Sequence, residues 1–401
     1  MNGHAFDEPP AVPSDEIAAL LRLTLARGVG PVLVSRLLDA FGDADAALGG
    51  SAIQLARVPG IGPKRAEAIL RAARDADEHV DRELALAGEL GVRLVPKGSA
   101  EYPVLLDPLL DAPHLLYVRG VRLRRAAFRV AMVGSRTCTA YGIEQAERFG
   151  SVLAGAGLEI VSGGARGIDT AGHRGALRGG APEQACTVAV LGCGLAECYP
   201  PENAALFDEI ARRGSVVSEL PLRTRPSAEN FPARNRLISG MSLGVIVIEA
   251  GLKSGALITA RLAAEDHGRE VLVLPGRVDS RASDGSHHLL KQGGGLLVTE
   301  PGDVIAALEG AAGHQVSGTH GSRYGPESAT SQIGGPETDA RADLSDDARS
   351  LLNAVGDGAT VDELIARLGV DVATARRLIT RLELAGILRR DGTLVRRVDH
   401  L

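Results

Sequence analysis

The sequence predicts an α/β fold in which a doubly wound, mostly parallel sheet lies between a helical N-terminal unit and a winged-helix C-terminal unit. Three observations predict this order. Between residues 128 and 299, short β-branched apolar runs alternate with helical stretches, and unbroken apolar strands separated by helices are typical of a parallel sheet covered on both faces. Gly-containing hairpins punctuate short helices before that region. A helix–helix–hairpin pattern follows it.

The N-terminal residues are expected to form a polar arm and a small helical domain. Residues 1–13 are polar and contain proline, so we interpret them as a flexible arm before a helical domain over 14–80. One hairpin in that domain matches the helix-hairpin-helix pattern of SAM-like domains. Its Gly60 and Gly62 would let backbone amides reach a DNA phosphate, and Lys64 would add positive charge. The alternative is that the hairpin serves only for packing.

A Rossmann-like domain is expected over 81–310, with a lead-in segment at 93–120 that extends one edge of its sheet. Its predicted strands share an unbroken apolar character that suits burial on both faces. They are Phe128–Val133, Leu158–Val161, Thr187–Leu191, Val216–Ser218, Val245–Ile248, Val271–Leu274 and Leu296–Val298.

The C-terminal part is expected to be a flexible linker at 311–345, rich in Gly, Ser, Thr and Pro, followed by a winged-helix domain at 346–401. Thr360 and Glu363 form a capping box at the start of one helix. Three arginines lie off the apolar stripe of the next helix: Arg376, Arg377 and Arg381. We expect Arg377 and Arg381 to reach DNA phosphates, and the alternative is a solvated basic face.

The composition is that of a globular protein without disulfides or membrane spans. Hydrophobic residues make up 45% and charged residues 23% of the 401 residues. Four cysteines are too few for a disulfide framework, no secretory segment opens the chain, and no apolar run approaches the roughly 20 residues that span a bilayer. We therefore expect a cytoplasmic protein that does not bind membranes.

The formal net charge of −6 is unevenly distributed. Residues 121–300 carry 21 Lys and Arg against 18 Asp and Glu, whereas the remainder carries 23 against 32. The local field at a cleft governs binding, so the overall charge does not exclude a nucleic-acid ligand. Aromatic residues are only 3%, so any stacking of bases must depend on one or two side chains.

Two turns between a strand and a helix carry the strongest signals for an anion site. In an open α/β sheet, ligands bind at the carboxyl ends of the strands, where glycines, a small hydroxyl and a helix N-terminus favour phosphate. Each turn also holds an arginine, whose planar guanidinium suits phosphate oxygens. The first turn contributes Gly134, Ser135 and Arg136, and the second contributes Ser162, Gly163, Gly164, Arg166 and Gly167. We expect Arg136 and Arg166 to flank one pocket.

Two further segments add candidate DNA contacts. In the first, a base would stack on Phe231 while Arg234, Asn235 and Arg236 meet flanking groups. The alternative is that Phe231 only plugs a structural loop. The second segment follows a predicted strand and opens a helix, and it supplies Lys253, Ser254, Gly255 and Thr259.

Four titratable residues near these turns are expected to support the pocket rather than to catalyse a reaction. They are Asp169, His173, Glu219 and Glu249. A carboxylate and an imidazole within reach of one another can do acid–base chemistry, but no activated nucleophile or metal-ligand set accompanies them in the sequence. We expect Asp169 to cap its helix or to pair with Arg166. No catalytic residue, metal or cofactor is predicted.

In order along the chain, these segments resemble the DNA-processing protein A family (DprA, also called Smf). The resemblance covers the whole central domain and depends on the motifs GSR, SGGARGID, FPARNR and EAGLKSGALITA. It implies a single-stranded DNA-binding protein of natural transformation, a homodimer, and loading of a RecA-type recombinase onto the incoming strand. The winged helix would add a contact to double-stranded DNA.

An enzyme of the lysine-decarboxylase-like phosphoribohydrolase group is the competing interpretation. That group shares the sheet and a Gly-rich second turn, but its PGGxGTxxE motif has no counterpart here, because Pro275-Gly276 lacks the rest of it. A dinucleotide-dependent dehydrogenase fits less well, since the first turn lacks GxGxxG.

Overall fold

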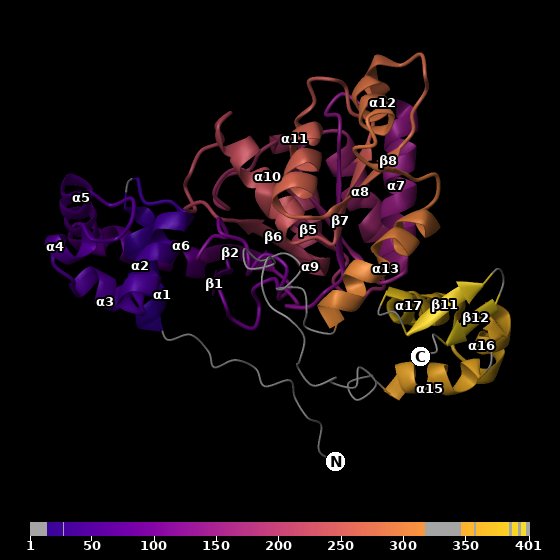
Figure 1. Ribbon diagram of the computed structural model, residues 1–401. Coiled ribbons are helices and arrows are strands. Elements are labelled where there is room, and N and C mark those ends of the chain that lie inside the picture. Colours follow the sequence, from indigo (N-terminus) through magenta and orange to yellow (C-terminus); the bar gives the residue numbers. More distant parts are fainter. Residues whose placement is uncertain are drawn as a thin grey trace.

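The structure is a computed structural model that describes residues 14–26, 28–316, 346–356, 358–384, 387–391 and 394–397. The predicted arm at 1–13 lies outside the described residues, as does the predicted linker from residue 317 onward. Figure 1 shows the helical unit, the central sheet domain and the winged-helix unit in one row.

The N-terminal unit consists of helices whose bounds follow from local signals. Pro31 and Pro63 open α2 and α5 at their first positions, where a missing N–H costs nothing. Ser51 and Gln54 form a capping box on α4. The helices are α1 (Ser14–Leu25), α2 (Pro31–Phe41), α3 (Ala44–Gly49), α4 (Ala52–Leu55), α5 (Pro63–Arg74) and α6 (Asp77–Glu89).

The central sheet has the order β1-β2-β6-β5-β4-β3-β7-β8-β9. All neighbours from β6 to β9 are parallel, whereas β1 and β2 pair antiparallel at one edge. The strands are β1 (Val92–Pro96), β2 (Leu115–Gly120), β3 (Arg129–Gly134), β4 (Glu159–Ser162), β5 (Thr187–Val190), β6 (Ser215–Ser218), β7 (Gly244–Ile248), β8 (Glu270–Leu274) and β9 (Leu296–Leu297). The seven predicted strands and the addition of segment 93–120 to one edge are therefore confirmed, whereas the antiparallel direction of that edge was not predicted.

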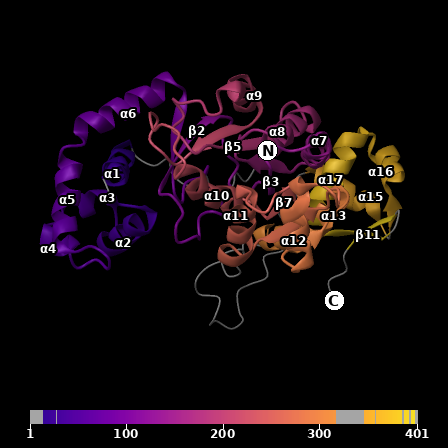
Figure 2. The same ribbon diagram turned by 90° about the horizontal axis from the view of Figure 1, so that it is seen from above.

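Helices cover both faces of this sheet (Figures 1 and 2). They are α7 (Ala140–Gly155), α8 (Ile168–Gly179), α9 (Ala204–Arg213), α10 (Asn230–Gly240), α11 (Gly255–Arg261), α12 (Asp284–Lys291) and α13 (Pro301–Val316). Successive residues of β7 enter opposite cores: Val245 and Val247 join one cluster, while Ile246 and Ile248 join the other. Because both faces are dry, every position of the strand must be apolar.

The chain order of the strands places a topological switch point between β3 and β7. From β3 the chain winds outward through β4, β5 and β6, and it then returns to the other side of β3 to build β7, β8 and β9. The connecting segments that leave the carboxyl ends of β3 and β7 therefore run to opposite faces of the sheet, and a crevice for a ligand lies between them.

The helical unit is packed directly against the central domain. Leu21 and Val80 belong to the same apolar core as the sheet, and the buried Glu83 carboxylate accepts a hydrogen bond from the Leu222 amide at 2.6 Å. Helix α6 runs through the predicted boundary at residue 80, so no cut at that position leaves two intact units.

The C-terminal unit contains α15 (Asp346–Val355), β10 (Ala359–Thr360), α16 (Val361–Leu368), α17 (Val372–Leu384), β11 (Leu388–Asp391) and β12 (Leu394–Arg397). The Thr360–Glu363 capping box is present. Strand β10 was not predicted, because two residues are too short to give a pattern.

Helix α13 continues to Val316 and buries Ala311 and Ala312 in the central core, so the first six residues of the predicted linker are helical. No helix in the described ranges is long and apolar enough to cross a membrane.

We predict that acid weakens the join between the helical unit and the sheet. His114 lies 2.9 Å from the Ser35 hydroxyl across this join, and burial, followed by the charge of Lys97, lowers its pKa from 6.5 to about 4. The unfolded chain takes up this proton near pH 6.5 and the folded chain only near 4, so stability falls as the pH drops between these values. At about 1.4 kcal/mol per pKa unit, the loss is about 2–3 kcal/mol.

Denaturant unfolding between pH 7 and pH 4.5 measures this loss. His114→Gln should make the acid limb less steep, because one of the buried histidines that take up a proton on unfolding is gone, while His173 and His267 remain. The exposed His79→Gln in the same unit is the matched control and should follow the wild-type curve. Identical pH profiles for wild type and His114→Gln would contradict the assignment.

Candidate nucleic-acid interface

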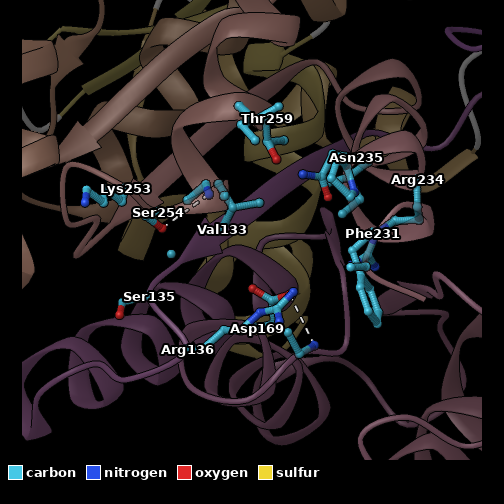
Figure 3. A pocket seen from close by; sticks show the side chains of 18 of the residues that line it. Val133, Ser135, Arg136, Asp169, Phe231, Arg234, Asn235, Lys253, Ser254 and Thr259 are labelled. Atoms are coloured by element: carbon cyan, nitrogen blue, oxygen red, sulfur yellow. Dashed lines mark hydrogen bonds between the residues drawn. The ribbon is translucent and has the colours of Figure 1, made fainter. Parts of the chain in front are cut away.

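A cavity of about 820 Å³ opens at the switch point, at the carboxyl ends of β3 and β7 (Figure 3). Its wall is made by the turn after β3, the start of α8, the segment leading into α10, and the turn between β7 and α11. Of the predicted DNA contacts, those that line it are Gly134, Ser135, Arg136, Phe231, Arg234, Asn235, Lys253, Ser254, Gly255 and Thr259. Three segments far apart in sequence are thus brought to one hollow.

Arg136 and Phe231 form the most distinctive group in this cavity. The guanidinium carbon of Arg136 lies 5.2 Å from the centroid of the Phe231 ring, within the range of a cation–π contact. On the same ring, Tyr199 packs with a centroid distance of 5.3 Å and an angle of 40° between the planes. Arg136 remains exposed and Phe231 is half-buried, so an exposed positive charge is held beside two aromatic rings.

A buried pair of opposite charges supports the cavity floor. Asp169 accepts hydrogen bonds from the amides of Gly163 at 3.1 Å and Ala165 at 3.2 Å. Arg234 donates through Nη1 to the carbonyls of Gly163, at 2.7 Å, and Val190. Burial raises the pKa of Asp169 and lowers that of Arg234 to about 10, while each charge opposes the shift of the other. Arg234 therefore ties α10 to the ends of β4 and β5.

Gly163 is required at this place for steric reasons. A Cβ atom on it would lie 2.6 Å from both terminal nitrogens of Arg234 and from a carboxylate oxygen of Asp169. The small residue expected to face a phosphate instead makes room for the buried charge pair.

Glu249, directly after β7, binds to the residue that caps the N-terminus of α7. Its carboxylate accepts hydrogen bonds from the Thr139 amide at 2.7 Å and the Thr139 hydroxyl at 2.5 Å, and its carbonyl accepts one from the Ser135 amide at 2.7 Å. Its φ of 47° is the only positive value among the described non-glycine residues. Since an acidic side chain already occupies this helix N-terminus, a phosphate cannot take the same place.

The sequence and the fold both match one known family. The model of the DNA recombination-mediator protein A family matches residues 93–309, a SAM-like helix-hairpin-helix tandem matches 20–75, and the DprA winged-helix domain matches 335–392. The family match alone spans more than half of the chain. The chain belongs to the DNA recombination-mediator protein A family.

Relatives of this family cover most of the chain. Protein Smf of Escherichia coli is 39% identical over 295 residues, which are 73% of this chain and 74% of that protein. DNA processing protein DprA of Streptococcus pneumoniae is 44% identical over 209 residues, or 52% of this chain and 71% of that protein. The X-ray structure of the Streptococcus pneumoniae DprA superposes with a TM-score of 0.62 over 72% of this chain and 97% of that one, at 33% identity.

Membership in the family confirms the fold class and the resemblance found in the sequence. The family is one of recombination mediators, so it also confirms the prediction that the chain is not an enzyme. Among the residues that the structure describes, no three His, Cys, Asp or Glu side chains lie together as metal ligands.

Arg166 does not line the cavity, although the sequence placed it there with Arg136. The two turns do touch, because the Ile168 amide donates to the Ser135 carbonyl at 3.2 Å. The Arg166 side chain, however, forms an ion pair with Glu202, just after the cis Tyr199–Pro200 bond. Of the two roles expected for Asp169, the pairing with Arg166 is not found; its carboxylate accepts from amides of the turn before α8, rather than from the helix itself, and lies near Arg234.

Other predicted residues also have structural partners outside the cavity. Arg236 forms ion pairs with Glu219 and Asp111. The Ser162 hydroxyl is buried and donates to the Met132 carbonyl at 2.6 Å. His173 is fully buried against the Thr187 hydroxyl at 2.7 Å, and burial lowers its pKa to about 3.

Two predicted glycines have close packing contacts. Gly164 packs on Phe207. Gly167 has φ of 79°, and a Cβ atom there would lie 2.2 Å from the Ser135 carbonyl.

The sequence analysis did not assign Tyr199, Thr137 or the segment 226–228 to the DNA site, although they also line the cavity. Tyr199 is one of only five tyrosines, and this scarcity of aromatic residues was a usable signal. Thr137 and residues 226–228 carry no pattern that distinguishes them from ordinary turns.

The secondary candidates lie on the two flanking units. Gly60 has φ of 86°, and its carbonyl accepts from Arg65 at 3.0 Å. Gly62 and Lys64 are exposed at the start of α5. Arg377 and Arg381 belong to α17, but their side chains lie outside the described residues.

We predict that Arg136 and Phe231 act on single-stranded DNA as one unit, to which Arg166 is coupled more weakly. Phe231→Ala should weaken binding by about 1–3 kcal/mol. Arg136→Ala should also weaken it and should lower the salt slope by about one phosphate contact. Because the guanidinium rests on the ring, the double variant should deviate from additivity by about 0.5 kcal/mol or more.

The matched comparison is the Arg136→Ala, Arg166→Ala double variant, which should deviate less from additivity, since Arg166 pairs with Glu202 and meets the Arg136–Phe231 group only through Tyr199. Fluorescence anisotropy titrations of the three single and two double variants measure both cycles. Additivity for Arg136 with Phe231, together with coupling for Arg136 with Arg166, would reverse the assignment.

Proposed function

We propose that this chain binds single-stranded DNA in the cavity at the switch point and loads a RecA-type recombinase onto it in the cytoplasm during natural transformation. Membership in a family of recombination mediators supports the general role. The observation that carries the choice of ligand is the Arg136–Phe231–Tyr199 group at the cavity wall.

A single strand suits this cavity better than a duplex does. Base pairing and stacking hide the faces of the bases in a duplex, so only an unpaired base can reach aromatic rings inside a hollow. Base edges in the major groove of a duplex are read by a protruding helix or β-ribbon, and a concave cavity offers neither. The cavity therefore favours splayed nucleotides.

Side-chain cations supply the phosphate contacts in this proposal. Arg136 and Lys253 are both exposed and project from different sides of the cavity (Figure 3). The acidic groups nearby have other partners, because Asp169 is buried under backbone amides and Glu249 is bound to Thr139. Ser135, Ser254 and Asn235 add small polar groups at the wall. The phosphates of a strand that crosses the mouth would meet one cation on each side.

A homodimer is the second element of the proposal, with the β9 edge of the sheet as its contact. Within the part of the chain that the structure describes, strand β9 pairs with β8 alone. Leu296 and Leu297 are 51% and 58% exposed on it. An open edge strand with two exposed leucines is a natural surface for another copy of the same chain.

The helix-hairpin-helix unit would provide an additional backbone contact. Lys64 and Arg65 stand beside the Gly60–Gly62 turn at the start of α5, where Gly62 and Lys64 are exposed. These groups would hold phosphates without reading sequence.

We predict tighter binding to a single-stranded oligonucleotide than to its duplex, with affinity that falls steeply as salt rises. Each phosphate neutralised on a single strand contributes a slope of about −0.7 in log K against log salt. Anisotropy titrations with both forms at several salt concentrations measure this. Equal affinity for the two forms, or affinity indifferent to salt, would contradict the proposal.

We also predict that Leu296→Arg with Leu297→Arg converts a dimer to a monomer. A buried arginine without a partner costs several kcal/mol in an interface. Ile53→Arg, at a 71% exposed position of the helical unit, is the matched control and should leave the dimer intact. Sedimentation equilibrium reports the mass directly, and a dimer that survives the leucine changes would place the contact elsewhere.

A further inference from the structure

Helix α17 of the winged-helix unit packs against α13 of the central domain. The two helices lie side by side in both views (Figures 1 and 2). Of the elements that contact α17, α13 has the most extensive contact. In a winged-helix fold the second helix of the helix-turn-helix, here α17, is the one that enters the major groove of DNA.

The face of α17 that meets α13 is the one that would otherwise point outward. Ala375, Ile379 and Leu382 are buried and mark the inner side of the helix. At 3.6 residues per turn, Thr380 lies about 130° around the helix from their centre. Even so, Thr380 is only 4% exposed and Glu383 only 8%. The core of the winged-helix unit cannot cover a residue on the opposite side, so α13 must cover it.

The contact is polar on the side of α17. Glu309 of α13 is half-buried and lies close enough to Glu383 and Arg389 to feel both charges. Polar interfaces within a chain resemble transient protein contacts, because little apolar area is removed from water. This contact is therefore suited to release.

We propose that α13 is an autoinhibitory surface for the winged-helix unit: it covers the outward face of α17 and keeps that face from duplex DNA until the two helices separate. The basic character of the covered helix supports this. Arg376, Arg377 and Arg381 all lie in α17 off its apolar stripe, and Arg389 on β11 is exposed beside it. The covering helix places the Glu309 carboxylate near Arg389 as well as near Glu383.

Glu309→Arg in the full chain tests the proposal. An arginine there repels Arg389 but attracts Glu383, so the separation of α17 from α13 is expected from its longer side chain at a half-buried position between the helices. Small-angle X-ray scattering should then show a larger radius of gyration. Affinity for a blunt duplex should rise about tenfold, because a basic face gains phosphate contacts. Glu300→Arg makes the same change of charge at an exposed position just before α13 and should leave duplex affinity unchanged.

A second variant and a second ligand complete the test. Thr380→Trp should wedge the helices apart without adding charge and should also raise duplex affinity. Adding Arg377→Ala to Glu309→Arg should abolish the gain. Single-stranded affinity reports the central cavity and should stay constant throughout, so failure of this inference differs from failure of the proposed function.

Two results would overturn the autoinhibition. In one, the domains separate but duplex affinity equals that of Glu300→Arg. In the other, neither Glu309→Arg nor Thr380→Trp changes the scattering or the duplex affinity.

Discussion

The junction that Glu249 makes between β7 and the turn after β3 holds the rest of the site in place. β7 and β3 are neighbours in the sheet, but the chain reaches β7 only after building β4, β5 and β6. Glu249 fastens the two ends by three hydrogen bonds, two to Thr139 and one to Ser135. Its left-handed backbone is a cost of order 1 kcal/mol that such bonds offset. Arg136 follows Ser135 directly, so its position depends on this junction.

The same junction decides what kind of positive charge the cavity offers. In many phosphate sites of α/β proteins, the N-terminus of a helix holds the anion. Here the Glu249 carboxylate occupies the end of α7, and the Asp169 carboxylate takes the amides of the turn before α8. The backbone dipoles at these two places are thus neutralised, and the side chains of Arg136 and Lys253 provide charge beside the N-terminus of α11, where Ser254 and Gly255 line the cavity. Side chains that can move suit a ligand that passes through many conformations, as a single strand does.

The strands could be predicted from the sequence because burial on both faces requires an unbroken run of apolar residues, and such a run is visible within the strand itself. Gly244–Ile248 is apolar at every position since each side chain enters a core. The turns after β3 and β7 were also predictable, because glycine and small polar residues after such a strand have few other uses. The ion-pair partners of individual charged side chains could not be predicted from the sequence. Arg166 is drawn to Glu202 and Arg236 to Glu219, and both pairings depend on how distant segments meet in three dimensions. The sequence likewise contained Asp169 and Arg234 without any sign that both are buried beside Gly163.

The two flanking units are attached by different forces, and this difference bears on how each can act. The helical unit shares an apolar core with the sheet through Leu21 and Val80, and apolar burial at about 25 cal/mol per Å² makes such a join hard to open. The winged-helix unit has its own separate core, and it presents Thr380 and Glu383 to α13 rather than leucines. Polar groups that leave this contact regain hydrogen bonds with water, so separation costs little. A ligand that binds the face of α17 covered by α13 therefore shifts the equilibrium between the docked and the separated winged-helix unit, to an extent set by its affinity for the separated state relative to the docked one. The N-terminal unit acts as a fixed extension of the DNA-binding domain, whereas the C-terminal unit is built to come away from it.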